Sequence, residues 1–306
     1  MHVLVVCLNP TIQRTYVVNG LRLGEVNRVV EHRTDASGKG VNAARVLASL
    51  GAHPTHLSHS GGRDHDLFVE AAGEDGIRMD AVSAEVELRV ANTIVDAHNG
   101  TTTEVVEEGR EVDAGVESRV QERYGELLED AEAVLIAGSK APGFSGELFP
   151  GMVARARRAG RFVLLDYRGE DLLKSLPYGP NAIKPNFSEF VRTVLPQKGA
   201  AEVSEHADDP SLVSAVREEM LRINSEYGCD VVVTRGALPT LYVEDQQVRE
   251  RQVPAVEVVN TIGSGDAFGA GFLYARFGGA SVGEAVRFAG ECASKNAARL
   301  KPGSID

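Results

Sequence analysis

Apolar residues follow two kinds of pattern, and the two patterns alternate along this chain. Short, mostly apolar runs occupy residues 3–8, 134–137, 162–166, 182–184, 231–234 and 240–243. Such runs are typical of strands in a parallel sheet that is covered on both faces. Between them, apolar residues repeat at helical spacing, most clearly over residues 41–50, 117–128, 149–159, 211–226 and 282–299. This alternation of strands and helices predicts a doubly wound α/β fold with a mostly parallel sheet.

Two stretches depart from the alternation and predict a second, smaller sheet. Residues 14–19 and 26–33 are rich in β-branched side chains around a glycine turn, and residues 89–97 and 101–106 flank the hairpin signal Asn99-Gly100. A chain of 306 residues is near the upper limit for one hydrophobic core. We therefore expect a single domain over residues 1–306. Its α/β core would cover about 1–10, 35–86 and 111–306, and its small β sheet about 11–34 and 87–110.

Charge and cysteine content narrow the classes of partner. The chain has 32 Lys plus Arg against 44 Asp plus Glu, a formal charge of −12, and no basic block. Nucleic acid and anionic membranes are therefore excluded as expected partners, and a phosphorylated ligand would need a local positive pocket. The three cysteines are widely spaced, and the apolar N-terminus is too short for a signal peptide. Both features predict a cytoplasmic protein with reduced thiols.

The segment 260–272, NTIGSGDAFGAGF, carries the strongest chemical signal. Gly263 and Gly265 allow the backbone to bend until successive N–H groups, with that of Ser264, point at one anion. A small-residue helix begins at this point, and its dipole favours a phosphate there. Asp266 in the first turn would accept the proton of an attacking hydroxyl. The alternative is a glycine-rich turn in which Asp266 only caps the helix.

Four segments together resemble one family. Residues 263–266, GSGD, resemble the GAGD signature of the ribokinase-like (PfkB) sugar kinases, with Ser264 at the usual Ala position. Residues 35–47, DASGKGVNAARVL, resemble the GGKGxNxA segment, and residues 183–190, IKPNFSEF, are similar to the KPNxxE element. Residues 8–15, LNPTIQRT, and 23–28, LGEVNR, resemble the branch of 1-phosphofructokinases and tagatose-6-phosphate kinases. The resemblance covers essentially the whole chain.

This resemblance implies an ATP-dependent kinase that uses Mg²⁺. The acceptor would be fructose 1-phosphate, fructose 6-phosphate or tagatose 6-phosphate, and the product a bisphosphate. It also implies that the small sheet is a lid over the sugar and often the contact of a homodimer. Two alternatives stay open: a kinase of an unphosphorylated sugar or nucleoside, and a catalytically silent sensor that binds nucleotide or sugar phosphate.

Polar residues follow the predicted strands at their carboxyl ends, where open α/β sheets bind ligands. With the resemblance, they give a set of expected site residues. The catalytic group is Asp266 with Gly263, Ser264 and Gly265. The acceptor would contact Gln13, Gly38, Lys39, Asn42, Arg89, Ser139 and Lys140, with Arg89 on its phosphate. ATP would contact Lys184, Asn186, Thr234, Gly236, Gly265 and Asn296, and Mg²⁺ would be held through water by Asn186 and Glu189.

Gln13 is the clearest departure from the resembled branch, whose members carry an Asp there. A carboxylate only accepts hydrogen bonds, whereas an amide both donates and accepts. We therefore expect Gln13 to alter which hydroxyl pattern the site accepts without affecting phosphoryl transfer.

Overall fold

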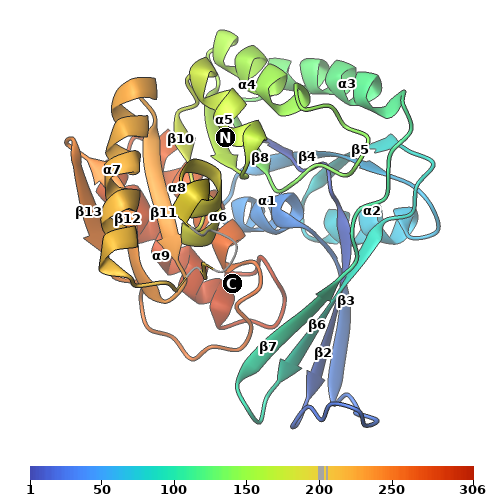
Figure 1. The fold of residues 1–306 in the computed structure, drawn as a ribbon. Helices are drawn as coiled ribbons and strands as arrows, with labels where there is room; N and C mark the ends of the chain where they lie inside the picture. Colours follow the sequence, from blue (N-terminus) through green and yellow to red (C-terminus); the bar gives the residue numbers. More distant parts are fainter. Residues whose placement is uncertain (199–202, 205) are drawn as a thin grey trace.

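A nine-stranded sheet forms the core of the computed structural model, which describes residues 1–198, 203–204 and 206–306 (Figure 1). Its strands are β1 (His2–Val6), β4 (His53–Ser60), β5 (Arg78–Ser83), β8 (Ala133–Ala137), β9 (Phe162–Asp166), β10 (Ala182–Ile183), β11 (Asp230–Arg235), β12 (Leu238–Glu244) and β13 (Gln247–Arg251). Their order is β13-β12-β11-β10-β9-β8-β1-β4-β5. The seven strands from β11 to β5 are parallel, and β12 and β13 add an antiparallel edge.

Helices cover both faces of this sheet (Figure 1). One face packs against α1 (Lys39–Ser49), α2 (His65–Glu74), α8 (Ser264–Phe277) and α9 (Val282–Ala297). The other packs against α3 (Val116–Asp130), α4 (Leu148–Arg158), α5 (Glu170–Ser175), α6 (Phe187–Val194) and α7 (Pro210–Tyr227). Short 3-10 turns lie at η1 (Leu176–Tyr178) and η2 (Pro196–Lys198). The predicted doubly wound α/β fold is confirmed.

Strand β1 shows why the apolar runs are continuous. Val3 and Val5 pack on the α1 side, whereas Leu4 and Val6 pack on the α3 side. Successive side chains of a strand point to opposite faces, so a sheet buried on both faces requires apolar residues at every position. None of the described helices combines the length and the apolar character needed to cross a membrane.

A separate four-stranded sheet, here called the lid, projects from the core (Figure 1). Its strands are β2 (Thr11–Val18), β3 (Glu31–Ser37), β6 (Arg89–Asp96) and β7 (Thr101–Val106), in the order β3-β2-β6-β7. Strands β2 and β6 are parallel, and the other pairs are antiparallel. Gly100 has a φ of 64° in the tight connection between β6 and β7, which explains the glycine there.

The sequence pattern placed one lid strand wrongly. Residues 26–33 were expected to form a strand, but β3 begins at Glu31. Val26 and Val30 lie in the connection that precedes it and are 80% and 69% exposed. β-branched side chains favour a strand only where a neighbouring strand is available to pair, and β2 pairs with residues 31–37.

Strand β1 lies inside the sheet, and later strands of the chain are added on both of its sides. From β1 the chain continues to β4 and β5 on one side, whereas β8 to β11 extend on the other. Asn9, just after β1, donates from Nδ2 to Oγ of Ser139, just after β8, at 2.9 Å. Open α/β sheets bind ligands at such a point, beyond the carboxyl ends of the strands.

Candidate active site

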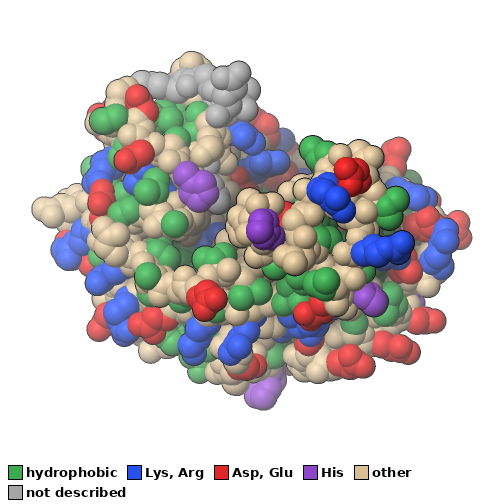
Figure 2. All heavy atoms as spheres, turned by 90° about the horizontal axis from the view of Figure 1, so that it is seen from below, with side chains coloured by type: hydrophobic (Ala, Val, Ile, Leu, Met, Phe, Trp, Pro, Cys, Tyr) green, Lys and Arg blue, Asp and Glu red, His purple; other side chains and the backbone are tan. Residues whose placement is uncertain are grey.

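A cleft of about 920 Å³ lies among the lid, the start of α1, the loops after β10 and β11, and the α8–α9 side of the core. Figure 2, a view from below Figure 1, shows this face of the molecule hollowed. The lid contributes Gln13, Arg89 and Glu104 to the lining, and the core contributes Lys39 and Asp266. The cleft is large enough for two small-molecule substrates side by side.

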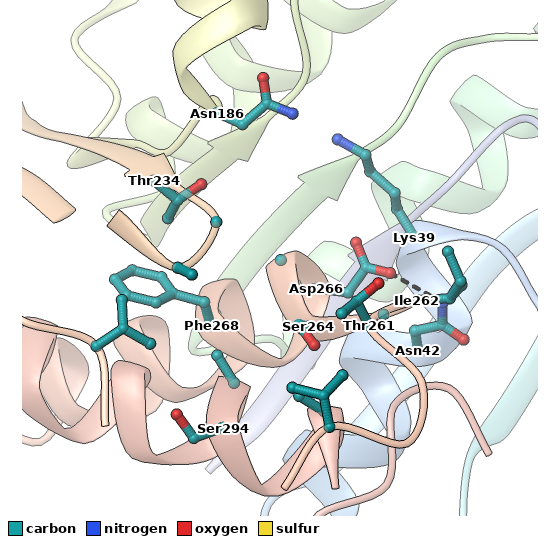
Figure 3. A pocket seen from close by; sticks show the side chains of 18 of the residues that line it. Lys39, Asn42, Asn186, Thr234, Thr261, Ile262, Ser264, Asp266, Phe268 and Ser294 are labelled. Atoms are coloured by element: carbon teal, nitrogen blue, oxygen red, sulfur yellow. Dashed lines mark hydrogen bonds between the residues drawn. The ribbon is translucent and has the colours of Figure 1, made fainter. Parts of the chain in front are cut away.

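Asp266 lies in the first turn of α8 and is 8% exposed. Its Oδ2 accepts a hydrogen bond of 2.8 Å from Nδ2 of Asn42 on α1 (Figure 3). Burial raises the pKa of Asp266 to about 6, helped by Asp166 and opposed by Lys39, Asn42 and Lys184. The carboxylate is thus ionised at neutral pH and is a better proton acceptor than an ordinary aspartate.

The turn before α8 is held by Asn296 of α9. Asn296 is fully buried, donates from Nδ2 to the Ile262 carbonyl at 2.9 Å and to Ser264 Oγ at 3.0 Å, and accepts from Gly303 N at 2.6 Å. Gly263 has a φ of 82°, and a Cβ there would lie 2.8 Å from Gly303 N. The expected ATP-binding residue Asn296 therefore braces this turn.

Two lysines and two carboxylates form a buried network beside Asp266. Lys39 Nζ lies 3.2 Å from Asp166 Oδ1 and 3.0 Å from Glu189 Oε1, and Lys184 Nζ lies 3.1 Å from Asp166 Oδ2. Burial disfavours the charged form of Lys39, but Asp166 and Glu189 outweigh it and raise its pKa. Lys39 lines the cleft, and its ammonium group is paired with these two carboxylates.

Sequence reasoning missed Asp166. It is the last residue of β9, where a carboxylate closes the apolar run Phe162–Asp166. A charge at the carboxyl end of a buried strand was the available signal.

Asn186 and Glu189 form a capping box at the start of α6. Asn186 Oδ1 accepts from Glu189 N at 2.8 Å, and Glu189 Oε2 accepts from Asn186 N at 3.0 Å. Burial would raise the pKa of Glu189, but Lys39 and Lys184 outweigh it and lower that pKa. Both residues line the cleft, and Figure 3 shows Asn186 opposite the Lys39 ammonium.

Arg89 begins β6 at the base of the lid and lines the cleft. Its Nη2 donates to the Asn9 carbonyl at 3.3 Å, and its buried Nε has no hydrogen-bond partner. Among the described residues, no carboxylate lies within ion-pair distance of Arg89, although Glu104 is near enough for the two charges to interact. A buried guanidinium N–H without an acceptor carries a desolvation cost.

The cleft brings together most of the residues that the sequence indicated. They are Gln13, Gly38, Lys39, Asn42, Arg89, Lys184, Asn186, Glu189, Thr234, Gly236, Gly263, Ser264, Gly265 and Asp266. Ser139, Lys140 and Asn296 do not line it. Lys140 pairs with Asp171 at 2.6 Å and lies over the Phe149 ring, and Ser139 contacts Asn9. The strand-end position of Lys140 suggested a ligand contact, but the side chain turns toward α4 and α5.

Comparison with known proteins defines the class of this enzyme. The family model of pfkB family carbohydrate kinases matches residues 4–305, and the chain belongs to that family. It is thus a sugar kinase, a phosphotransferase with an alcohol group as acceptor, and the family implies ATP as the donor.

Solved structures share its fold. One, from Thermotoga maritima, is described as a possible 1-phosphofructokinase (TM-score 0.84, 23% identity, 98% of this chain and 93% of that chain). Another is phosphofructokinase-2 from Escherichia coli in complex with fructose-6-phosphate (0.81, 21%, 99% and 95%). A third, from Agrobacterium tumefaciens, is provisionally assigned as a ribokinase (0.80, 19%, 99% and 92%).

Proposed function

We propose that this sugar kinase transfers the γ-phosphate of ATP to a hydroxyl of a ketohexose phosphate and so forms a bisphosphate. The acceptor would be fructose 1-phosphate, fructose 6-phosphate or tagatose 6-phosphate. The observation that carries the proposal is Arg89, a cation in the cleft that no described carboxylate contacts at ion-pair distance and whose buried Nε has no acceptor.

The described part of the cleft lining contains three Lys or Arg residues. Lys39 and Lys184 are neutralised by Asp166 and Glu189. Arg89 forms no ion pair, although the Glu104 carboxylate is near enough for the two charges to interact, and its buried Nε needs an acceptor that a phosphate oxygen would supply. A neutral sugar would offer that N–H no charged acceptor. The fructose-6-phosphate bound in the Escherichia coli neighbour supports the same substrate class.

In the proposed mechanism, Asp266 accepts the proton of the attacking sugar hydroxyl. The N–H groups of Gly265 and Asp266 lie in the first turn of α8, where no preceding helical carbonyl accepts them, so they can stabilise charge on the γ-phosphoryl group. Because phosphoryl transfer has a loose transition state, positioning and charge stabilisation dominate. A base with a pKa of about 6 is sufficient for this step.

We propose that Mg²⁺ enters this site with ATP. No three His, Cys, Asp or Glu side chains of the described chain converge to hold a metal ion. Mg²⁺ keeps several waters and binds substrate phosphates with one or two protein oxygens. Asn186 and Glu189 would hold it through water, and the ion would neutralise phosphate charge.

Glu189→Gln is expected to raise the Mg²⁺ concentration needed for half-maximal activity by several-fold, because an amide attracts a hydrated cation less than a carboxylate does. The amide oxygen can still cap α6, but the ion pair with Lys39 is lost, so the melting temperature should fall. Activity is titrated with Mg²⁺ at saturating ATP and acceptor. An unchanged titration would assign Glu189 to helix capping and the Lys39 ion pair.

The lid is also the proposed contact of a homodimer. Four large apolar side chains near its tip and edge are 59% to 92% exposed: Leu23, Val26, Val30 and Val105. Leu23, Val26 and Val30 belong to one connection, between β2 and β3, and neighbouring exposed apolar side chains commonly mark an association surface.

Light scattering should therefore give a molar mass near twice 32.7 kDa. Leu23→Asp should return it to the monomer value, since it places a charge in an apolar contact. Leu67→Asp, at an exposed position of α2 outside the lid, is the matched control. A wild-type monomer at all protein concentrations would exclude the lid dimer.

The acceptor class is tested by ADP release with a panel of sugar phosphates, their parent sugars and nucleosides. The proposal predicts the highest kcat/KM with one of the three ketohexose phosphates. A preference for a parent sugar or a nucleoside would assign the other kinase class. Nucleotide or sugar-phosphate binding without turnover on any acceptor would indicate a sensor.

A further inference from the structure

A hydrogen-bonded row crosses three adjacent strands on the face of the lid that lines the cleft. Gln13 lies on β2, Thr93 on β6 and Glu104 on β7. Gln13 Nε2 donates to Thr93 Oγ1, and Thr93 Oγ1 donates to Glu104 Oε1 at 3.3 Å. Gln13 is only 2% exposed, and it lines the cleft together with Glu104 and Arg89. The row therefore links a buried amide of the cleft wall to a carboxylate on the edge strand.

Counting protons in this row fixes the orientation of the Gln13 amide. A carboxylate only accepts hydrogen bonds, so Glu104 takes the single hydroxyl proton of Thr93. Thr93 Oγ1 then offers only a lone pair to Gln13, and the amide must turn its NH₂ group toward Thr93. The orientation of the amide therefore follows from the Thr93 to Glu104 hydrogen bond of 3.3 Å.

The consequence is that the amide oxygen remains for the ligand. Among the described residues, Gln13 Oε1 has no hydrogen-bond partner. A carbonyl oxygen on the cleft wall that has no protein donor gains a hydrogen bond when a ligand hydroxyl supplies one. The hydrogen bond to Thr93 uses one of the two N–H donors of the amide and fixes which end of the amide faces Thr93.

We propose that Thr93 and Glu104 are positioning residues that hold the Gln13 amide with its NH₂ group at Thr93 and leave its oxygen to accept a hydrogen bond from a sugar hydroxyl at this point of the lid. The inference rests on the proposed function only in requiring a sugar acceptor. It assigns a role in acceptor specificity to Thr93 and Glu104, two residues of the lid that bind no phosphate. It also lets the Gln13 oxygen accept a hydrogen bond from the sugar, as a carboxylate oxygen would, without a negative charge.

A double-mutant cycle separates orientation from packing. Thr93→Val keeps the shape of the side chain but removes its hydroxyl, so the Gln13 amide is free to turn its NH₂ group to the sugar. Gln13→Glu supplies a carboxylate, which presents an acceptor oxygen whichever way it turns. Thr93→Val should therefore raise KM for the acceptor only when residue 13 is Gln.

The expected values are measured at pH 8 with the best acceptor of the panel. Thr93→Val should raise KM for the acceptor about tenfold, the loss of one hydrogen bond to a buried group, and leave KM for ATP within about twofold. Adding Thr93→Val to Gln13→Glu should change KM for the acceptor by less than about twofold. Glu104→Ala should raise it about threefold, because the Thr93 proton is then free to turn toward Gln13.

Thr15→Val is the matched control. Thr15 is fully buried on β2 opposite Thr93, and its Oγ1 has no hydrogen-bond partner. The same substitution there should leave KM for the acceptor unchanged. Thermal unfolding of each variant reports any loss of folding.

Two results would overturn the inference. An equal rise in KM after Thr93→Val in the Gln13 and Gln13→Glu backgrounds would show that Thr93 acts through packing. A Thr93→Val enzyme that behaves like wild type would show that the row does not orient the amide. If wild type phosphorylates no sugar in the panel, the proposed function fails before any variant is made, and the inference falls with it.

Discussion

Asp266→Asn should fold like wild type and lose turnover by about a thousandfold, since a positioned general base contributes about 10²–10⁴. The Asn42 hydrogen bond can be kept, because the new amide still offers an acceptor oxygen. The fold raises the pKa of Asp266 from 3.8 to about 6 and so disfavours its ionised form. That cost to stability is absent below pH 3.8 and fully present above pH 6. At pH 7 a neutral Asn avoids it, so the melting temperature should not fall.

The wild-type pH profile is the companion measurement. The base must be ionised to accept a proton, so kcat/KM should fall as pH decreases through about 6, and the residual activity of Asp266→Asn should lack this limb. Near-normal kcat in a folded Asp266→Asn enzyme would remove Asp266 from the role of base.

Arg89→Ala should raise KM for the sugar phosphate by about tenfold to a hundredfold. A charge-assisted hydrogen bond to phosphate contributes about 1.5–3 kcal/mol, which corresponds to that range. KM for ATP should change little, because Lys39, Lys184 and the first turn of α8 are untouched.

Arg14→Ala is the control for loss of charge, because Arg14 is an exposed residue of the same sheet. It should leave both KM values near those of wild type. Equal increases in KM for ATP and for the acceptor after Arg89→Ala would exclude a specific phosphate contact.

Elements with a strong local pattern could be predicted from the sequence. The apolar run of β9 and the hairpin strand β7 were placed at their observed bounds, and the helix predicted over 211–226 is α7 (Pro210–Tyr227). In each case local side chains and turn residues favour the same conformation. The small-residue start of α8 likewise indicated Asp266 without tertiary information.

Other elements depended on tertiary context. Strand β4, HPTHLSHS, contains a proline and three histidines and has no apolar run, yet it is mostly buried between β1 and β5. Its hydrogen-bonded neighbours determine its conformation, and they are distant in sequence. Asp166 becomes part of the site only because β9 ends beside Lys39 and Lys184.

Gln13 shows that the role of a single side chain can also depend on tertiary contacts that the local sequence does not predict. Its residue type allows both donation and acceptance, and the sequence predicts only that its hydrogen bonds differ from those of an Asp. Thr93 lies 80 positions away and accepts a hydrogen bond from the amide nitrogen. No local pattern around Gln13 contains that information.

The product of the wild-type reaction tests the central claim most directly. The enzyme is incubated with ATP, Mg²⁺ and an equal mixture of each ketohexose phosphate and its parent sugar, and the products are followed by ³¹P NMR. The account predicts a new sugar-phosphate resonance that appears with ADP at equal rates, beside the original phosphate of the same sugar. Transfer to the parent sugar in preference to the sugar phosphate, or release of inorganic phosphate alone, would contradict it.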